Sequence, residues 1–228
     1  MIYCLFQWFV KCSGFIPQLL IFRTKTTFED KRVQGRRLRG KAIVVANHNA
    51  LMDFGVLMYT FPLRTLRCAA AELLYHKNPF MTFLITMLGC VRVEREQCDF
   101  SFMDRLKAVL DKGGVVEIFP ESRLPDRKGD TMPLPFKPSY VYLALETGAP
   151  IIPVYHNGCA FRSERLQVVV GKPIDVLAMY DNALTEKENV KRINDYVRRK
   201  IIELSKNVTS PYAFGENEVC ETTQEIQA

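Results

Sequence analysis

The stretch that decides the fold is Ala42–Gly55, which reads A-I-V-V-A-N-H-N-A-L-M-D-F-G. Its first half, Ile43–Ala46, is a continuous apolar run of the kind that forms a buried strand. His48 follows this run, and Asp53 comes five residues later. Because positions five apart on one helix diverge by roughly 140°, the two side chains touch only if His48 lies in a turn and Asp53 in the first turn of a helix. The stretch therefore predicts a strand, a turn and a helix near residues 53–60.

The two side chains suit acid–base chemistry. A carboxylate beside an imidazole fixes the tautomer of the ring and raises its basicity, as a general base requires. Side chains that directly follow a buried strand are held firmly at the rim of a pocket. We therefore predict that His48 is a general base and that Asp53 orients it.

Length and composition indicate one main domain. The chain has 228 residues, of which 48% are hydrophobic and 25% charged, ordinary values for a globular protein with a sizeable core. We expect an apolar membrane-contact segment at residues 1–24, the main domain at 25–207 and a disordered tail at 208–228. The tail is predicted because its sequence shows little hydrophobic periodicity.

The first 22 residues are strongly apolar but poorly suited to span a bilayer. Lys11, the pair Ser13-Gly14, and Pro17 divide the run into halves too short for a hydrocarbon core of about 30 Å. The segment lacks the basic start and the cleavage site of a signal peptide. We expect two short helices that lie in the membrane interface and are anchored by aromatic side chains. Ordinary packing of this segment on the domain remains the alternative.

The positive charge is concentrated in one segment. The net charge is +6, and residues 31–41 read K-R-V-Q-G-R-R-L-R-G-K. Such a cluster contacts nucleic acid, anionic lipid or only water. No aromatic side chains are interleaved for base stacking, so contact with lipid headgroups is favoured over nucleic-acid binding.

The cysteines indicate a reducing compartment. Their number is seven, which is odd, and no C-x-x-C spacing occurs. The pattern suggests neither a zinc site nor a disulfide framework. We expect a peripheral or monotopic protein on the cytoplasmic face of a membrane.

Strands and helices alternate along the rest of the chain. Strands are predicted at residues 43–46, 66–71, 89–95, 115–119, 151–155 and 166–170, with helices around 53–60, 72–88, 102–110, 139–147 and 185–204. The 72–88 helix is interrupted at Asn78-Pro79, and residues 80–88 are apolar nearly all round, so they form either plain core or the wall of a groove. This alternation predicts an α/β fold with a largely parallel central sheet flanked by helices.

Polar residues follow several of the predicted strands. In an open α/β sheet, ligands bind outside the carboxyl ends of the strands. The guanidinium groups of Arg95 and Arg123 suit a phosphate, and Glu121 suits a hydroxyl group. No G-x-S-x-G elbow is present, so a covalent nucleophile is not indicated. His156, at the end of a later strand, remains a candidate to line the same site.

These residues also carry a resemblance to a known family. The blocks N-H-N-A-L-M-D, G-C-V-R-V-E-R, F-P-E-S-R and I-I-P-V occur in this order over roughly residues 35–175. The chain therefore resembles the phosphate acyltransferase family that includes the 1-acylglycerol-3-phosphate acyltransferases. The third block differs from the family's F-P-E-G-T-R, because Ser122 stands where the glycine is usual and the threonine is absent.

The resemblance implies a reaction and roles for single residues. His48 would take the proton of an acceptor hydroxyl that attacks an acyl thioester, and Asp53 would orient the imidazole. Arg95 and Arg123 would hold the acceptor's phosphate, with Glu121 and Ser122 beside the glycerol. The thioester would come from coenzyme A or acyl carrier protein, so no cofactor or metal is expected.

Three alternatives stay open at this point. The acceptor is another lysolipid in the first, such as an ornithine-lipid precursor or a lysophospholipid. The second is a non-catalytic lipid-binding protein of the same fold. The third is a membrane-surface protein whose basic run binds nucleic acid, which would make that binding sensitive to salt.

Overall fold

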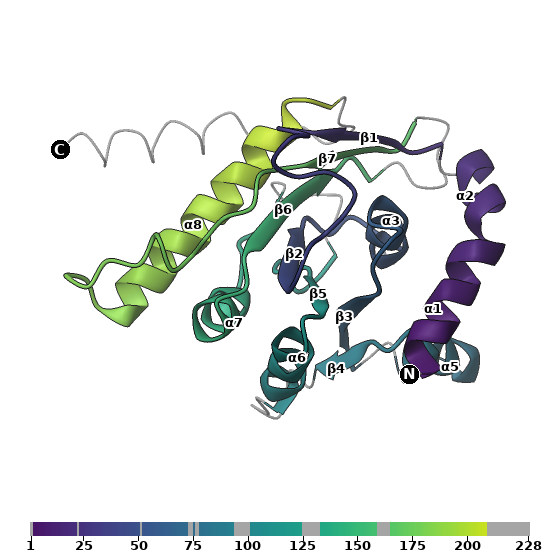
Figure 1. The fold of residues 1–228 in the computed structure, drawn as a ribbon, viewed down its shortest axis with the longest axis horizontal. Coiled ribbons are helices and arrows are strands. Elements are labelled where there is room, and N and C mark those ends of the chain that lie inside the picture. Colours follow the sequence, from purple (N-terminus) through teal and green to yellow (C-terminus); the bar gives the residue numbers. More distant parts are fainter. Residues whose placement is uncertain are drawn as a thin grey trace.

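The computed structural model describes residues 2–21, 23–50, 52–72, 75, 78–93, 101–124, 133–158 and 165–208. In this part of the chain the strands form one seven-stranded sheet with the order β1-β7-β6-β2-β5-β3-β4 (Figure 1). The strands are β1 Lys25–Phe28, β2 Ala42–Ala46, β3 Leu66–Ala71, β4 Val91–Val93, β5 Val115–Ile118, β6 Ile151–His156 and β7 Gln167–Val170.

The strand of the opening stretch occupies the middle of the sheet. Every residue of β2 is buried, and β2 pairs in parallel with both β5 and β6. One neighbouring pair, β6 with β7, is antiparallel. The predicted α/β fold with a largely parallel sheet is therefore confirmed.

One strand, β1, was not predicted. Its sequence K-T-T-F carries a single large apolar side chain, Phe28, and among the described strands it pairs with β7 alone, at the edge of the sheet. A half-exposed edge strand of four residues has little apolar periodicity, so the sequence pattern carries no signal for it.

Helices cover both faces of the sheet (Figure 1). They are α1 Ile2–Ser13, α2 Phe15–Ile21, α3 Asp53–Thr60, α5 Pro79–Met87, α6 Ser101–Asp111, α7 Ser139–Thr147 and α8 Glu186–Ser205. Ile43 and Val45 of β2 contribute to the core beneath α6, α7 and α8, whereas Val44 contributes to the core beneath α3. This alternation follows from the period of two along a strand.

Local signals explain where two of the helices begin and end. Thr185 caps α8, because its hydroxyl accepts from Glu188 N while the Glu188 carboxylate accepts from Thr185 N. Gly148 ends α7 with φ 63°, a left-handed conformation that glycine adopts without a Cβ clash. The predicted helices at 139–147 and 185–204 therefore agree with the structure to within a residue or two.

The N-terminal segment forms two short helices, as predicted. The break between them lies at Gly14, where an added Cβ would collide with the hydroxyl of Tyr59. Pro17, expected to interrupt the run, lies instead in the first turn of α2, where its missing N–H has no helical partner to lose. No helix in the described ranges is both long and apolar enough to cross a membrane.

Several predictions fall on residues outside the described ranges. They concern Arg95 and the disordered tail from residue 209 onward. The division of the chain at residues 24 and 207 likewise stays a prediction.

Candidate active site

The predicted contact between His48 and Asp53 is present. His48 lies in the turn after β2, and Asp53 is the first residue of α3. His48 Nδ1 is 3.0 Å from Asp53 Oδ2. With the proton on Nδ1 donated to this carboxylate, Nε2 is left with a free lone pair. The pair has the arrangement of a general base and its orienting carboxylate.

Asp53 is held in place by the turn that precedes it. Its Oδ2 atom accepts hydrogen bonds from Asn49 N at 2.6 Å and from Ala50 N at 2.8 Å, and only 1% of its side chain is exposed. These bonds close the turn around the carboxylate, and no lysine or arginine of the described ranges pairs with it. Asp53 therefore shapes the turn as well as orienting His48.

Glu121 reaches the same turn from β5. One carboxylate oxygen accepts from His48 N at 2.8 Å, and the other accepts from Leu134 N at 2.8 Å. Burial raises the pKa of Glu121 to about 7, although these two bonds and His48 act in the opposite direction. The structure thus gives Glu121 a bridging contact to the backbone of the His48 turn, not a contact with the imidazole.

Ser122 follows in an uncommon backbone conformation. Its φ is 62°, in the left-handed region that favours glycine, and its hydroxyl donates to Pro120 O at 3.3 Å. The chain therefore keeps the backbone that the family glycine would allow, with a side chain added. Arg123 comes next and is exposed. Its predicted companion Arg95 lies outside the described residues.

His156 joins the site, which the sequence left open. In the parallel pairing of β2 with β6, Ala46 is opposite Val154, so His156 is level with His48. His156 Nε2 lies 2.9 Å from Asn47 O and 3.5 Å from Asp53 Oδ2, and the imidazole is fully buried. Asn47 returns two bonds, accepting from His156 N and donating to His156 O, both at 2.9 Å. The register of β2 with β6 would have placed His156 beside Asp53. Strand register cannot be derived from a single sequence.

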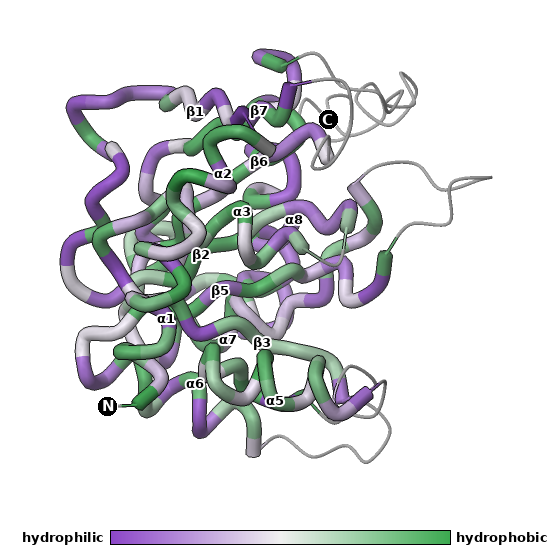
Figure 2. The backbone as a smooth tube through the Cα atoms, turned by 90° about the vertical axis from the view of Figure 1, so that its right-hand side faces the viewer, coloured by the Kyte–Doolittle hydropathy of each residue, from purple (hydrophilic) through white to green (hydrophobic). Residues whose placement is uncertain are grey.

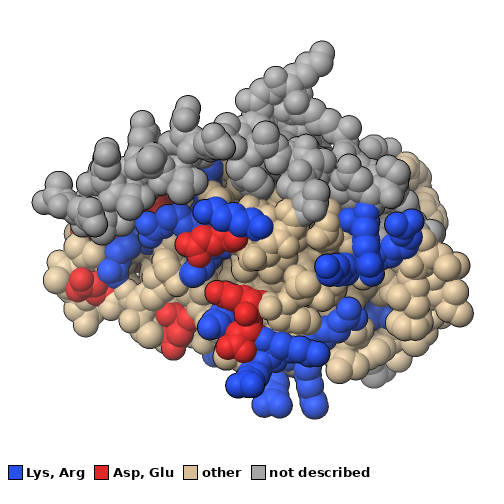
Figure 3. Space-filling view, turned by 90° about the horizontal axis from the view of Figure 1, so that it is seen from above, with Lys and Arg blue, Asp and Glu red and all other residues tan. Residues whose placement is uncertain are grey.

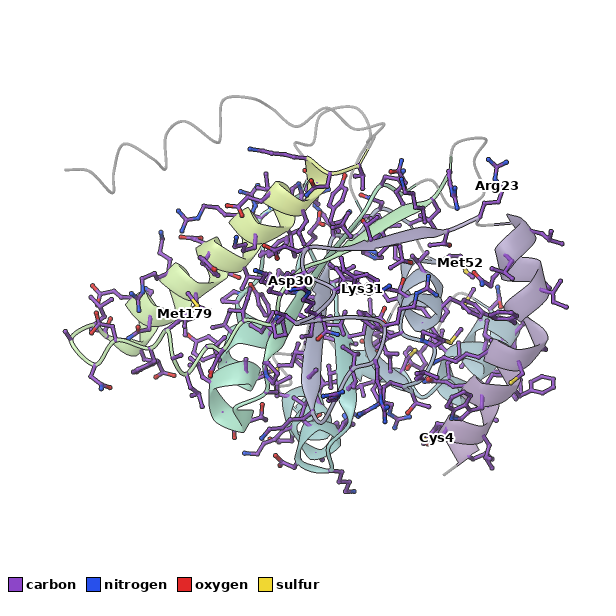
Figure 4. The ribbon with its side chains drawn as sticks, turned by 45° about the horizontal axis from the view of Figure 1, so that its top comes forward. Cys4, Arg23, Asp30, Lys31, Met52 and Met179 are labelled. Carbon is purple, nitrogen blue, oxygen red and sulfur yellow. The ribbon has the colours of Figure 1, made fainter. Side chains whose placement is uncertain are left out.

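An apolar pocket opens beside His48. Its wall includes Met52 and Phe54 from the start of α3, the strand segment 68–71, and Leu84 and Ile85 of α5. Met52 is labelled in Figure 4, on the side of the sheet where α1 packs. The His48 ring also stacks on Phe119, with centroids 4.6 Å apart. The predicted wall at residues 80–88 therefore adjoins the imidazole, which favours its interpretation as a groove over plain core.

Fold and site together define a class of protein. It is an α/β protein with a histidine–aspartate pair at the carboxyl edge of its sheet and an apolar pocket next to the imidazole. Across the described ranges, no cluster of His, Cys, Asp or Glu side chains is arranged to hold a metal ion.

Comparison with known proteins identifies the family within this class. The sequence profile described as Acyltransferase matches residues 24–157, more than half of the chain. The chain therefore belongs to the acyltransferase family.

Relatives of known name support this assignment. A 1-acyl-sn-glycerol-3-phosphate acyltransferase of Limnanthes alba is 28% identical over 173 residues, which cover 73% of this chain and 59% of the relative. One of the same name from Borreliella burgdorferi is 30% identical over 175 residues, covering 72% of this chain and 67% of the relative. This chain thus spans less than two thirds of the length of the Limnanthes protein.

A solved structure shares the fold. The 1-acyl-sn-glycerophosphate acyltransferase of Thermotoga maritima superimposes with a TM-score of 0.54 and 20% sequence identity, covering 91% of this chain and 97% of that one. At this identity the likeness concerns the fold alone.

Proposed function

We propose that this protein is an O-acyltransferase that moves a fatty acyl group from a thioester to the hydroxyl of 1-acyl-sn-glycerol-3-phosphate, giving phosphatidic acid. The observation that carries the proposal is the His48–Asp53 pair at 3.0 Å, with its imidazole in the wall of an apolar pocket. The family and the names of its relatives point to the same reaction.

The chemistry needs no acyl-enzyme. His48 Nε2 takes the proton of the acceptor hydroxyl as the hydroxyl oxygen attacks the thioester carbonyl. Asp53 stabilises the imidazolium that forms. The tetrahedral intermediate then collapses, the carbon–sulfur bond breaks, and the proton passes to the leaving thiolate. Products are the new ester and free coenzyme A or acyl carrier protein.

The substrates are assigned by chemistry. The apolar pocket between β3 and α5 takes an acyl chain, because its lining is mostly apolar and it begins at His48. Arg123, with Arg95 as predicted from the family block, holds the acceptor's phosphate. Glu121 and Ser122 lie beside the acceptor, with Glu121 supporting the backbone of the His48 turn.

Membrane contact is the second part of the proposal. Helix α1 buries its polar residues Gln7 and Lys11 against the domain, whereas Leu5 and Phe9 are 63% and 66% exposed. This is the reverse of an ordinary surface helix. Figure 2 shows hydrophobic colour along α2 and α5 as well. An apolar face turned outward suits a lipid interface.

The polar face of α1 docks the helix firmly. Gln7 Nε2 donates to Leu66 O and Leu88 O, both at 2.6 Å, and Lys11 Nζ donates to Pro62 O at 3.3 Å and to two neighbouring carbonyls. The basic segment 31–41 is largely exposed, and Figure 3 shows Lys and Arg side chains in groups on the face seen from above. We propose that both features hold the protein on the cytoplasmic face of a membrane, where its free thiols Cys4, Cys12, Cys68 and Cys90 stay reduced.

An acceptor and donor panel tests the assignment. Purified protein is supplied with fatty acyl thioesters of coenzyme A or of acyl carrier protein, together with 1-acylglycerol-3-phosphate, lysophosphatidylcholine or lysophosphatidylethanolamine, and products are identified by mass spectrometry. We expect phosphatidic acid as the main product. Preference for another lysolipid would reassign the acceptor, whereas absence of acceptor-dependent thioester consumption would favour a non-catalytic lipid-binding protein.

A further inference from the structure

A second, strongly basic cavity lies away from the His48 site. It is lined by residues at the beginnings of three parallel strands, including Arg67 of β3, Cys90 before β4 and Gly114 before β5, and has a volume of about 720 Å³. His48 and Glu121, in contrast, follow the carboxyl ends of β2 and β5. Most of its lining therefore lies toward the opposite edge of the sheet from His48 and Glu121, although Cys90 also lines the apolar pocket beside His48.

Four cationic side chains from separate parts of the chain line this basic cavity. They are Arg67 of β3, Arg92 of β4, Arg105 of α6 and Lys112, which follows α6. No carboxylate belongs to the lining as far as the described residues extend. Arg92 pairs with Glu72, but Arg67, Arg105 and Lys112 form no ion pair with any described residue. A cavity lined by charges of one sign attracts ions of the opposite sign, so this cavity suits an anion.

Two of the guanidinium groups are held in position by neighbours. The Arg67 guanidinium lies over the ring of Tyr3, 4.5 Å from its centroid. Arg105 Nη2 donates to Arg92 O and to Ser101 Oγ, both at 3.2 Å. These contacts leave further N–H groups of each guanidinium for a ligand.

A glycine provides the room that Arg67 occupies. Gly89 has φ 73°, and a Cβ added there would lie 2.8 Å from the guanidinium carbon of Arg67. Only a residue without a side chain leaves the guanidinium in this place. The hydroxyls of Thr65 and Thr86 add neutral donors to the same wall.

We propose that the basic cavity binds a phosphate-bearing anion. Guanidinium forks match phosphate oxygens in geometry and charge, and several together suit a group with more than one negative charge. The phosphate has two possible sources, a soluble phosphate compound or the headgroup of an anionic phospholipid. A lipid source is within reach because Tyr3 and Cys4 of α1 line the cavity, and Cys4 is labelled on that helix in Figure 4. Only the lipid source rests on the proposed membrane contact of α1, and neither source depends on acyl transfer.

The test uses the purified full chain and two probes. Inorganic pyrophosphate binding is measured by titration calorimetry, and binding to phosphatidylcholine vesicles with or without phosphatidylglycerol is measured by flotation. The variant Arg67→Gln/Arg105→Gln is compared with Lys187→Gln/Lys206→Gln, which removes the same charge from exposed positions on and beside α8.

We expect the arginine variant to bind at least one probe tenfold more weakly, with the lysine control variant unchanged for that probe. Weakening for pyrophosphate alone indicates a soluble ligand, and weakening for the anionic vesicles alone indicates a lipid headgroup. Equal binding by the arginine and lysine variants for both probes overturns the proposal. Lys112→Gln, at an exposed position, tests the site without disturbing packing, and wild-type affinity of this variant for both probes would also overturn it.

Discussion

Asp53 concentrates the polar contacts of the site on one oxygen atom. Oδ2 lies within 3.5 Å of His48 Nδ1, Asn49 N, Ala50 N and His156 Nε2. A carboxylate surrounded by donors is held in one direction. The orientation of His48 as a base therefore depends on the contacts that position Asp53.

His156 is predicted to be a positioning residue. His156→Leu removes the imidazole contacts but keeps both bonds between Asn47 and the His156 backbone. We expect kcat to fall about tenfold, roughly 1.4 kcal/mol, with KM for the acceptor little changed. His156→Gln restores an N–H near Asn47 O and should recover most of kcat. Steady-state kinetics check this prediction. A higher KM with an unchanged kcat would show that the imidazole does not act through Asp53.

Ser122 is predicted to carry backbone strain. A non-glycine residue at φ 62° costs on the order of 1 kcal/mol. We expect Ser122→Gly to raise the free energy of unfolding by about that amount, measured by chemical denaturation. Ser122→Ala is the matched control, because it keeps the strain and loses only the hydroxyl bond to Pro120 O. Equal stabilisation by Ser122→Gly and Ser122→Ala would show that backbone strain is not the cause.

Glu121 is predicted to make stability depend on pH. Its pKa of about 7 lies above the ordinary value of 4.5, so the folded protein holds this proton more tightly than the unfolded chain. This contribution is complete below about pH 4.5 and is lost as the pH rises through about 7, a change on the order of 3 kcal/mol. Urea unfolding measures the free energy of unfolding between pH 5 and 8, and this free energy should decline less with pH in Glu121→Gln than in the wild type. The same pH dependence in both proteins would contradict the assignment.

At the scale of elements, α1 is the most informative helix. Gln7 and Lys11 share one face, because they are four residues apart, whereas Leu5 and Phe9 lie on roughly the opposite side of the helix. The polar face carries the hydrogen bonds to the domain, and the apolar face is exposed. The mean hydropathy of the segment could not reveal this, since the face that packs inward is the polar one.

Vesicle binding is predicted to depend on this outward face. Phe9→Glu/Leu20→Glu places two carboxylates at positions that are 66% and 72% exposed, so folding should be unaffected. Since burying one such side chain is worth about 1.5–3 kcal/mol, we expect at least a tenfold loss of flotation with liposomes. The control Leu177→Glu changes a 53% exposed leucine of the main domain and should bind as the wild type does. Equal loss in both variants would argue against α1 and α2 as the membrane contact.

Across the whole molecule, local sequence patterns predicted the helices and strands better than the tertiary contacts between them. The apolar run before His48 predicts its strand, and the glycine after α7 and the capping box of α8 likewise act within a few residues of the element they bound. β1 lacked such a cause, and the contacts of His156 depend on the register of strands more than 100 residues apart. The pairing of His48 with Asp53 was predictable because geometry allowed one arrangement only.

The basic cavity shows the same limit. Arg67, Arg92 and Arg105 stand apart in the sequence and meet only because β3 and β4 are neighbours and α6 packs against them. The blocks that carry the family resemblance do not include Arg67 or Arg105. The basic cavity is therefore formed by contacts between distant parts of the sequence, and no local pattern predicts it.

The central claim is that His48 is the base of acyl transfer. The direct measurement is the initial rate of phosphatidic acid formation from 1-acylglycerol-3-phosphate and an acyl thioester, for the wild type and for His48→Ala, with thermal unfolding as the check of folding. We predict that kcat falls by about 10²–10⁴, the usual contribution of a positioned base, while the unfolding temperature changes little. A folded His48→Ala variant with the wild-type rate would contradict the account.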